Sequence, residues 1–337
     1  MSASFFTPST RILITGGAGF IGSALAWELN RRGCERIVIA DFLGTSEKWR
    51  NLTPLRFEDY LEADDLRPRL QSGALGKFDV ALHLGACSAT TEKDATYLAR
   101  NNFEFTKDLA GWALENGTRF VYASSAATYG DGSAGMEDTL EEISRLRPLN
   151  MYGYSKQLFD LYAQRRGWLD HLVGMKYFNV FGPNEDHKGD MRSLVHKSTA
   201  QVRESGVIRL FKSHRPDFAD GEQKRDFLYV KDAVAITLHL AATAGAHGLY
   251  NVGSGEAHSW NQLARAVFGA LGLPDHIEYI DMPEGLRGKY QYFTQANIGK
   301  LRATGYDRPI TPLADAVKDY VTRYLVPDRR LGDELPE

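Results

Sequence analysis

The segment Tyr152-Gly153-Tyr154-Ser155-Lys156 has residue types and spacing suited to acid–base chemistry. Tyr152 and Lys156 are four positions apart, so on a helix they lie on one face, one turn from each other. An ammonium near a phenol favours the phenolate and lowers a pKa that is about 10 in an unperturbed tyrosine. Tyr152 is therefore a candidate proton acceptor near neutral pH. The alternative interpretation is a surface Tyr–Lys pair without a chemical role.

A second set of reactive side chains lies in the run SSAATYG at residues 124–130, directly after an apolar strand pattern at residues 119–124. A hydroxyl at the carboxyl end of a central strand can hydrogen-bond a substrate oxygen whose charge changes during reaction. Small hydroxyl residues in a turn also satisfy backbone groups, which is the structural alternative.

An apolar run that breaks into glycines, ILITGGAGFIG at residues 12–22, could hold a pyrophosphate. Residues 17–22 fit the G-x-G-x-x-G spacing, in which the backbone turns tightly and closely approaches a phosphate. The helix that follows offers unpaired N–H groups and a positive dipole end to the anion. A second strand, at residues 36–40, ends in Asp41, where an acid commonly hydrogen-bonds an adenine ribose. The sequence predicts a dinucleotide site; the alternative is a glycine-rich turn that binds nothing.

Strand and helix patterns alternate through the first half of the chain, which predicts an α/β fold: a doubly wound parallel Rossmann sheet with a smaller C-terminal substrate-binding lobe. We expect a dinucleotide-binding domain at residues 10–178. A substrate-binding lobe follows at residues 179–330, with some strands returning to the first domain, and a frayed tail at 331–337. Further strand patterns lie at residues 78–84 and 171–177, and helical patterns at 94–115 and 152–166. Ligands of such sheets bind outside the carboxyl ends of the strands.

Composition narrows the class of protein. The 337 residues are 43% hydrophobic and carry a net charge of −3. The chain therefore lacks the excess of basic residues that is typical of a dedicated nucleic-acid-binding protein. Two cysteines, Cys34 and Cys87, predict a reducing compartment without disulfides. No apolar run approaches the length of a membrane span, and the first residues do not resemble a signal peptide. We expect a cytoplasmic enzyme with no nucleic-acid or membrane partner.

Three motifs in order, TGGAGFIG (15–22), SSAATYG (124–130) and YGYSK (152–156), resemble the extended short-chain dehydrogenase/reductase family. That family makes nucleotide-sugar epimerases, dehydratases and decarboxylases. Four further runs are similar to the ADP-L-glycero-D-manno-heptose 6-epimerases: GACS (85–88), KYFNVFGPNEDHKGDM (176–191), KRDFLYVKD (224–232) and KYQYFTQA (289–296). They include the HKG motif at residues 187–189, and the similarity extends from Arg11 to about Tyr324.

The resemblance implies inversion at C6″ of ADP-D-glycero-D-manno-heptose to the L-glycero epimer, a precursor of the lipopolysaccharide core. A bound nicotinamide takes a hydride, a transient 6-keto sugar forms, and the hydride returns to the opposite face. One acid–base group cannot easily reach both hydroxyl positions at hydrogen-bond distance. The resemblance implies that Tyr152 exchanges the hydroxyl proton of one epimer and Lys188 that of the other, each acting in turn as base and acid. Ser125 would hold the substrate oxygen, and Lys156 would bind the nicotinamide ribose and lower the pKa of Tyr152. The alternative for Lys188 is a solvated loop lysine.

The resemblance, together with the glycine-rich motif, also implies two sets of binding residues and no metal site. The expected cofactor contacts are Gly16, Gly19, Phe20, Ile21, Gly22, Asp41, Phe42, Lys48, Leu84, Gly85, Ala86, Cys87, Ser88, Asn101, Lys156, Val180 and Lys188. The expected substrate contacts are Ser125, Asn179, Asp190, Lys197, Phe211, Lys212, Ser213, His214, Arg225 and Tyr290. The planar guanidinium of Arg225 suits the ADP pyrophosphate.

Two features leave alternatives open. Asp41 would repel a ribose 2′-phosphate and points to NAD, whereas Lys48 stands where the family places a 2′-phosphate partner and points to NADP, which we expect. A UDP-sugar 4-epimerase and a dTDP-sugar 4,6-dehydratase are rival activities, although Ala126-Ala127-Thr128 lacks the acidic pair of a dehydratase. A non-catalytic dinucleotide-sensing scaffold is the alternative outside the enzymes. The resemblance further implies a homo-oligomer, a pentamer.

Overall fold

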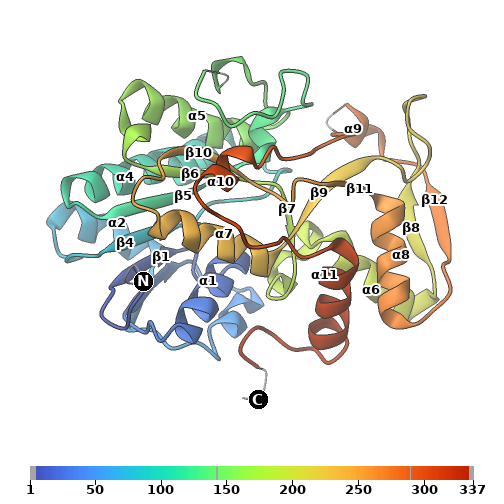
Figure 1. Ribbon diagram of the computed structural model, residues 1–337, viewed down its shortest axis with the longest axis horizontal. Coiled ribbons are helices and arrows are strands. Elements are labelled where there is room, and N and C mark those ends of the chain that lie inside the picture. The colour runs from blue at the N-terminus through green and yellow to red at the C-terminus, as the bar shows by residue number, and fades with distance from the viewer. Residues whose placement is uncertain (1–4, 142, 289, 334–337) are drawn as a thin grey trace.

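A computed structural model describes residues 5–141, 143–288 and 290–333, and a parallel sheet of seven strands lies at its centre (Figure 1). The strand order is β10-β6-β5-β4-β1-β2-β3, and every neighbouring pair is parallel. The strands are β1 (Ile12–Thr15), β2 (Ile37–Asp41), β3 (Asp59–Glu62), β4 (Val80–His83), β5 (Arg119–Ser125), β6 (Val173–Tyr177) and β10 (Gly248–Val252). The predicted doubly wound parallel sheet is confirmed.

Helices cover both faces of this sheet, which explains why its central strands are apolar throughout. Successive side chains of β1 point to opposite faces. Ile12 and Ile14 accordingly join the core of one face, Leu13 joins the core of the other, and all three are fully buried. One face carries α1 (Phe20–Arg31) and α7 (Val230–Ala242); the other carries α2 (Ala63–Ser72), α4 (Phe105–Glu115) and α5 (Met151–Arg165). No helix within the described ranges is long and apolar enough to cross a membrane.

The helical pattern at residues 94–115 is interrupted in the structure. It divides into α3 (Ala95–Leu98), a π-helical turn (Ala99–Glu104) and α4. The turn points the buried Asn102 at the loop after β4, where its amide nitrogen donates to the Cys87 carbonyl oxygen at 3.0 Å and its amide oxygen accepts from the Cys87 N–H at 2.9 Å. The same amide nitrogen lies 2.9 Å from the Ser155 hydroxyl of α5. An extra residue in a helix turn is a common device at functional sites.

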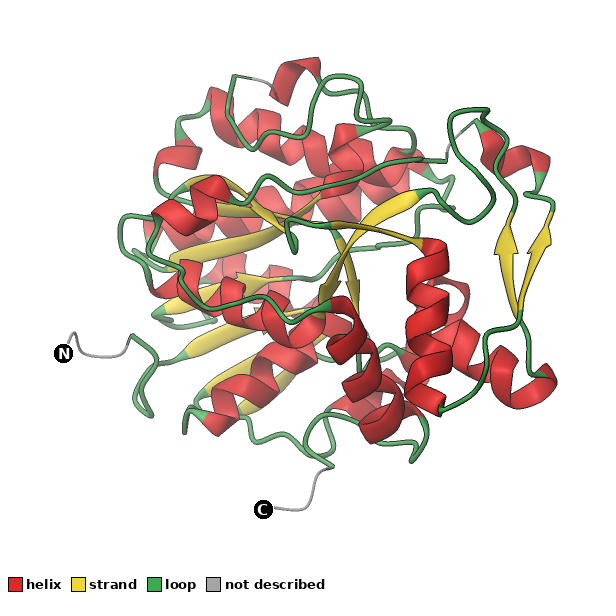
Figure 2. Cartoon of the chain, turned by 45° about the vertical axis from the view of Figure 1, so that its right-hand side comes forward, coloured by secondary structure: helices red, strands yellow, loops and turns green. Residues whose placement is uncertain are grey.

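The remaining strands and helices form a second group beside the carboxyl ends of the main sheet (Figure 2). A three-stranded sheet joins β7 (Asn179–Phe181), β9 (Lys224–Tyr229) and β11 (Ala257–Ser259), and a two-stranded one joins β8 (Ile208–Phe211) and β12 (Ile277–Ile280). The larger helices here are α6 (Leu194–Ser205), α8 (Trp260–Leu271) and α11 (Leu313–Tyr320), and α9 (Glu284–Arg287) is short; the short α10 (Gly299–Ala303) is an exception and packs against the edge strand β10 of the main sheet.

The end of the described chain packs more tightly than the sequence predicts. Leu331 was expected to open a frayed tail, yet its side chain is fully buried and its N–H donates to the Asn184 side-chain oxygen at 3.0 Å. An apolar side chain among charged neighbours can still enter the core when a loop offers it space and a hydrogen-bond acceptor. Residues 334–337 of the expected tail lie outside the described residues.

Candidate active site

A cleft of about 1040 Å³ lies at the carboxyl ends of the central strands, between the sheet and the second group of elements. It brings together most of the predicted site residues, although these are spread over almost the whole chain. The predicted residues that line it are Gly16, Gly19, Phe20, Ile21, Gly22, Asp41, Lys48, Leu84, Gly85, Ala86, Cys87, Ser88, Ser125, Tyr152, Lys156, Asn179, Val180, Lys188, Lys197, Phe211 and Tyr290. The position agrees with the rule for parallel sheets.

The glycine-rich loop has the backbone geometry that a pyrophosphate needs. Gly16 has a φ of 69°, and a Cβ there would lie 2.7 Å from the backbone nitrogen of Gly85. A Cβ on Gly22 would collide with the Gly16 carbonyl oxygen. Side chains at either position are therefore excluded, and the loop turns directly into the N-terminus of α1, whose first residues line the cleft. This glycine cradle fits a dinucleotide.

Asp41 and Lys48 form an ion pair at the adenosine end expected for such a ligand. The Lys48 ammonium lies 2.7 Å from one carboxylate oxygen of Asp41, which also accepts from the Phe42 N–H at 2.7 Å. The other oxygen accepts from the N–H groups of Ala18 and Gly19, at 2.9 and 3.1 Å. Asp41 therefore braces the glycine-rich loop, and Lys48 balances its charge.

Tyr152, Ser125 and Lys156 meet at the other end of the predicted cofactor site. Ser125 ends β5, Tyr152 stands in the first turn of α5, and Asn150 caps that helix by accepting from the Gly153 N–H at 2.9 Å. The Tyr152 hydroxyl hydrogen-bonds the Ser125 side chain. Lys156 follows one turn later and is buried, with its ammonium 2.8 Å from the Ala123 carbonyl oxygen.

The expected lowering of the Tyr152 pKa by Lys156 is not found in this structure. Burial raises the pKa of Tyr152, and the hydrogen bond with Ser125 only partly counters this effect. Burial also lowers the pKa of Lys156 to about 8, with Asp160 acting in the opposite direction. The reason is desolvation: both groups lose water on folding, and the ammonium is directed to the Ala123 carbonyl oxygen. A ligand that adds polar contacts would change this balance.

A buried ion pair beneath these residues was not anticipated from the sequence. Lys176 of β6 and Asp160 of α5 lie 2.9 Å apart, with side chains 1% and 0% exposed. Asp160 also accepts from the hydroxyls of Tyr122 and Ser124, and Lys176 donates to the Thr128 hydroxyl at 2.7 Å. The network joins α5 to the end of β5. Its only sequence signal was a charged residue within each apolar pattern.

Lys188 reaches the cleft from the short 3₁₀ segment Asp186–Met191, on the side of the glycine-rich loop. Its ammonium lies over the Phe20 ring, 4.9 Å from the ring centre, and 3.8 Å from a carboxylate oxygen of Glu185. Burial lowers the pKa of Lys188, and Glu185 opposes that shift. The side chain is 22% exposed, so the solvated loop lysine of the alternative interpretation does not describe it.

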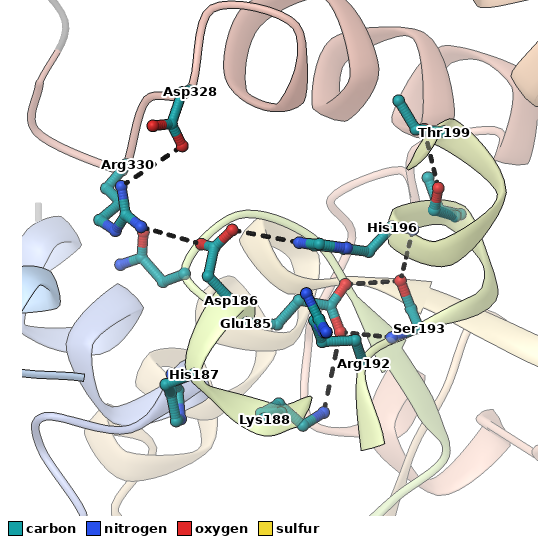
Figure 3. Close-up of polar contacts among 12 residues, drawn as sticks. Glu185, Asp186, His187, Lys188, Arg192, Ser193, His196, Thr199, Asp328 and Arg330 are labelled. Carbon is teal, nitrogen blue, oxygen red and sulfur yellow. Dashed lines mark hydrogen bonds and ion pairs between the residues drawn. The ribbon is translucent and has the colours of Figure 1, made fainter. Parts of the chain in front are cut away.

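The same segment is tied to distant parts of the chain (Figure 3). Asp186 lies 3.1 Å from the His196 ring on α6 and 3.6 Å from the Arg330 guanidinium near the end of the chain. His187 also lines the cleft, and burial, followed by the charges of Lys48 and Lys188, lowers its pKa to about 4. The loop that carries Lys188 is thus held by long-range contacts.

Seven predicted contact residues do not line the cleft in this structure. Phe42 is exposed, Asn101 bonds the Asn102 amide at 3.1 Å, and the exposed Asp190 contributes only its carbonyl oxygen, to Lys197. Lys212, Ser213 and His214 directly follow β8 and have other partners: the Lys212 ammonium pairs with Asp281, the Ser213 N–H donates to Asp220, and the His214 N–H donates to the Tyr292 hydroxyl.

Arg225, the seventh, is buried in β9. Its guanidinium donates to the carbonyl oxygens of Lys224 and Gln291 and lies 5.0 Å from the centre of the Tyr290 ring. Burial lowers its pKa to about 10. The register of a strand decides which way a side chain points, and a motif match alone cannot supply that register.

Several lining residues were missed by the sequence analysis. They are Ala89, Thr90, Met191, Arg192, Gln201, Arg209, Leu263, Trp260 and Ile280, with others that adjoin predicted runs. Ala89 and Thr90 extend the run 84–88 and could have been included on that ground. Met191 and Arg192 close the segment that carries Lys188, and the rest come from α6, α8, β8 and β12, whose packing no local pattern indicates. Within the described residues, no group of three or more His, Cys, Asp or Glu side chains could hold a metal ion.

Comparison with known proteins agrees with this architecture. A model of the NAD dependent epimerase/dehydratase family matches residues 12–253. A protein of Nitratidesulfovibrio vulgaris strain Hildenborough, named ADP-L-glycero-D-manno-heptose-6-epimerase, is 54% identical over 314 residues, covering 93% of this chain and 97% of its own. A protein of the same name from Fusobacterium nucleatum is 44% identical over 324 residues, covering 93% of this chain and 98% of its own.

Solved structures of epimerases also match this chain over nearly its whole length, at lower sequence identity. The crystal structure of Helicobacter pylori ADP-L-glycero-D-manno-heptose-6-epimerase superimposes with a TM-score of 0.79 at 28% identity, covering 96% of this chain and 98% of its own. A Thermus thermophilus UDP-glucose 4-epimerase in complex with NAD superimposes with a TM-score of 0.74 at 27% identity, covering 93% of this chain and 98% of its own.

Proposed function

The chain belongs to the NAD dependent epimerase/dehydratase family, and we propose that it inverts C6″ of ADP-D-glycero-D-manno-heptose to give ADP-L-glycero-D-manno-heptose. The observation that carries this proposal is one cleft that holds two different side chains able to exchange a proton: Tyr152 from α5, and Lys188 from the 3₁₀ segment Asp186–Met191, which we call the HKG segment. The names of the relatives supply the substrate. The product serves the synthesis of the lipopolysaccharide core.

An inversion needs acid–base groups at two positions, because the reacting hydroxyl points in different directions in the two epimers. When bound, the nicotinamide supplies hydride transfer at C6″ of the sugar. Tyr152 removes or returns the hydroxyl proton of one epimer, with Ser125 holding the same oxygen. Lys188 does the same for the other epimer. Lys156 orients the nicotinamide ribose and compensates the charge near Tyr152.

The cofactor in this proposal is NADP. Asp41 would repel a 2′-phosphate if its charge were free, but Lys48 pairs with it at 2.7 Å and three backbone N–H groups bind its oxygens. A lysine on a short exposed turn can also turn outward to a phosphate. Denaturing the purified protein and identifying the released nucleotide by mass spectrometry tests this proposal, and NAD as the sole product would overturn it.

The activity itself is tested by incubating the purified protein with ADP-D-glycero-D-manno-heptose and following the configuration at C6″ by NMR. The proposal expects an equilibrium mixture of both epimers without net consumption of cofactor. UDP-glucose and UDP-galactose serve as the competing substrates of a 4-epimerase. Conversion of these sugars, with ADP-heptose left unchanged, would refute the proposal.

Assembly and location complete the proposal. A homo-oligomer, a pentamer, rests on the resemblance to the heptose epimerases, and sedimentation velocity at several concentrations tests it. A single monomeric species would refute it. The proposed location is the cytoplasm, and it is supported by the two free cysteines, Cys34 and Cys87. Fractionation of the producing cells tests the location.

A further inference from the structure

Glu185 is a fully buried carboxylate at the start of the HKG segment. One of its oxygens accepts from the Ser193 hydroxyl at 2.5 Å and from the Tyr320 hydroxyl at 3.1 Å. The other accepts from the Ser193 N–H at 2.7 Å (Figure 3). Three donors from α6 and α11 therefore hold an anion in place. A buried charge is costly, and such a costly group calls for an explanation.

The oxygen that accepts from the Ser193 N–H also faces Lys188. The Lys188 ammonium lies 3.8 Å from it, close enough for strong attraction but beyond hydrogen-bond distance. None of the three ammonium protons is therefore used by Glu185. The ammonium lies instead over the Phe20 ring, at the edge of the cleft. Glu185 thus attracts Lys188 without occupying the protons that a substrate oxygen would need.

Glu185 and Lys197 are the charged groups that act on the Lys188 ammonium, whereas the neighbouring Asp186 pairs with His196 and Arg330. Lys197 on α6 lines the same cleft, and Arg192, whose guanidinium donates to the Gly189 carbonyl oxygen, lies beside it. Burial lowers the pKa of Lys188 most, Glu185 raises it, and Lys197 lowers it. His187 has a pKa of about 4 and adds no charge near neutrality. Glu185 is therefore the anion that balances Lys188.

We propose that Glu185 is a positioning residue for Lys188, which keeps the ammonium aimed into the cleft and favours its protonated form. This inference rests on the proposed function, in which Lys188 exchanges a proton with the substrate hydroxyl. A desolvated lysine among cations would lose its proton at a lower pH and would remain a neutral base. With Glu185 beside it, Lys188 regains a proton after each transfer and acts as an acid in the reverse direction. The donors from α6 and α11 keep Glu185 in the position that this task requires.

The test measures the ionisation of Lys188 directly in the holoenzyme without substrate. Brief reaction with trace acetic anhydride over a range of pH, followed by peptide mass spectrometry, gives the midpoint at which Lys188 becomes reactive. In Glu185→Gln we expect this midpoint to fall by about one pH unit, because an opposite charge at this distance shifts a pKa by one unit or more. Below the midpoint, Lys188 should then label about tenfold faster than in the parent protein.

Two control variants separate this effect from a loss of packing. Asp186→Asn removes the neighbouring carboxylate, which pairs with His196 and Arg330, and Tyr320→Phe removes a donor to Glu185 but keeps the charge. Both should lower thermal stability and leave the Lys188 midpoint nearly unchanged, because in each variant Glu185 keeps its charge and the two donors of Ser193. If Glu185→Gln does not fold, Glu185→Asp moves the charge back by one methylene and should give a smaller shift in the same direction.

An unchanged midpoint in Glu185→Gln, or an equal shift in Asp186→Asn, would overturn the proposal. The readout is independent of activity, so the two proposals can fail separately. Normal epimerisation by Lys188→Met would refute the role of Lys188 as an acid–base group, while the labelling result would still decide whether Glu185 controls its ionisation. A shifted midpoint together with a matching shift of the alkaline limb of kcat would support both.

Discussion

Replacing Lys188 with Met tests the two-base mechanism most directly. Methionine keeps an apolar stem and removes the ammonium, which lies over the Phe20 ring. A positioned acid–base group contributes roughly 10²–10⁴-fold to rate, so the loss of epimerisation should correspond to about 3–5 kcal/mol of transition-state stabilisation.

The same replacement should hardly change stability, which separates chemistry from folding. Glu185 keeps three hydrogen-bond donors, and its contact with Lys188 is a 3.8 Å ion pair without a hydrogen bond. The expected loss is about 1 kcal/mol in the free energy of unfolding. A matched control is Lys107→Met on α4, where a partly exposed lysine pairs with Glu104. This control should leave epimerisation unchanged.

The assay follows the configuration at C6″ by NMR, and the thermal unfolding of the parent enzyme and of each variant is measured in parallel. An analogue with an aldehyde at C6″ adds a second readout, since the parent enzyme should dismutate it to an acid and an alcohol. The double variant of Lys188→Met with Tyr152→Phe should be little worse than the poorer single variant, because groups that act as one unit are strongly non-additive. Near-normal epimerisation by Lys188→Met would refute the reasoning.

Four further predictions follow from the site. Tyr152→Phe should lower kcat by roughly 10²–10⁴-fold with nucleotide binding intact, and retention of half the activity in the NMR assay would contradict its role. Lys176→Met should destabilise the fold by about 3–5 kcal/mol in urea titrations by leaving Asp160 buried without its cation, and adding Asp160→Asn should recover part of the loss. Lys156→Met should stabilise the cofactor-free protein at pH 7 by up to about 3 kcal/mol, because the folded pKa of about 8 lies below the ordinary 10.5. The unfolded chain binds the extra proton, so this gain should be complete below pH 8 and shrink as pH rises toward 10.5; a constant gain in denaturant titrations at pH 7 and 10 would contradict it. Lys48→Gln should weaken NADP binding more than NAD binding in calorimetric titrations, and equal losses would count against a phosphate contact.

Much of the fold was predictable because its signals are local. The strand at Ile12–Thr15, the glycines after it and the helix Met151–Arg165 each follow from a pattern within about 15 residues. The edge strand Asp59–Glu62 was missed because only Leu61 is buried, so it has no apolar run. Strands of residues 179–330 were expected to return to the first domain, but the strand Gly248–Val252 was not located, because its place beside β6 depends on a crossover from the second group of elements.

The candidate site divides in the same way. Residue types and spacing in the sequence identified the Tyr152–Lys156 pair and the glycine-rich loop, and the family resemblance identified the HKG segment, since each is a contiguous motif. They could not show that Arg225 is buried against the Tyr290 ring without lining the cleft, or that burial, rather than Lys156, dominates the pKa of Tyr152. Both depend on which groups lose water, and that is set by chain segments far apart in sequence.

Glu185 illustrates the limit of the sequence most clearly. By itself it reads as one more acid in a charged loop. Tertiary packing of α6 and α11 buries it, supplies its three donors and directs its remaining face to Lys188. Local sequence determines which chemical groups are available and which elements carry them. Desolvation and long-range hydrogen bonding decide their charge and orientation, because the strength of an electrostatic interaction depends on the surroundings that only the folded chain creates.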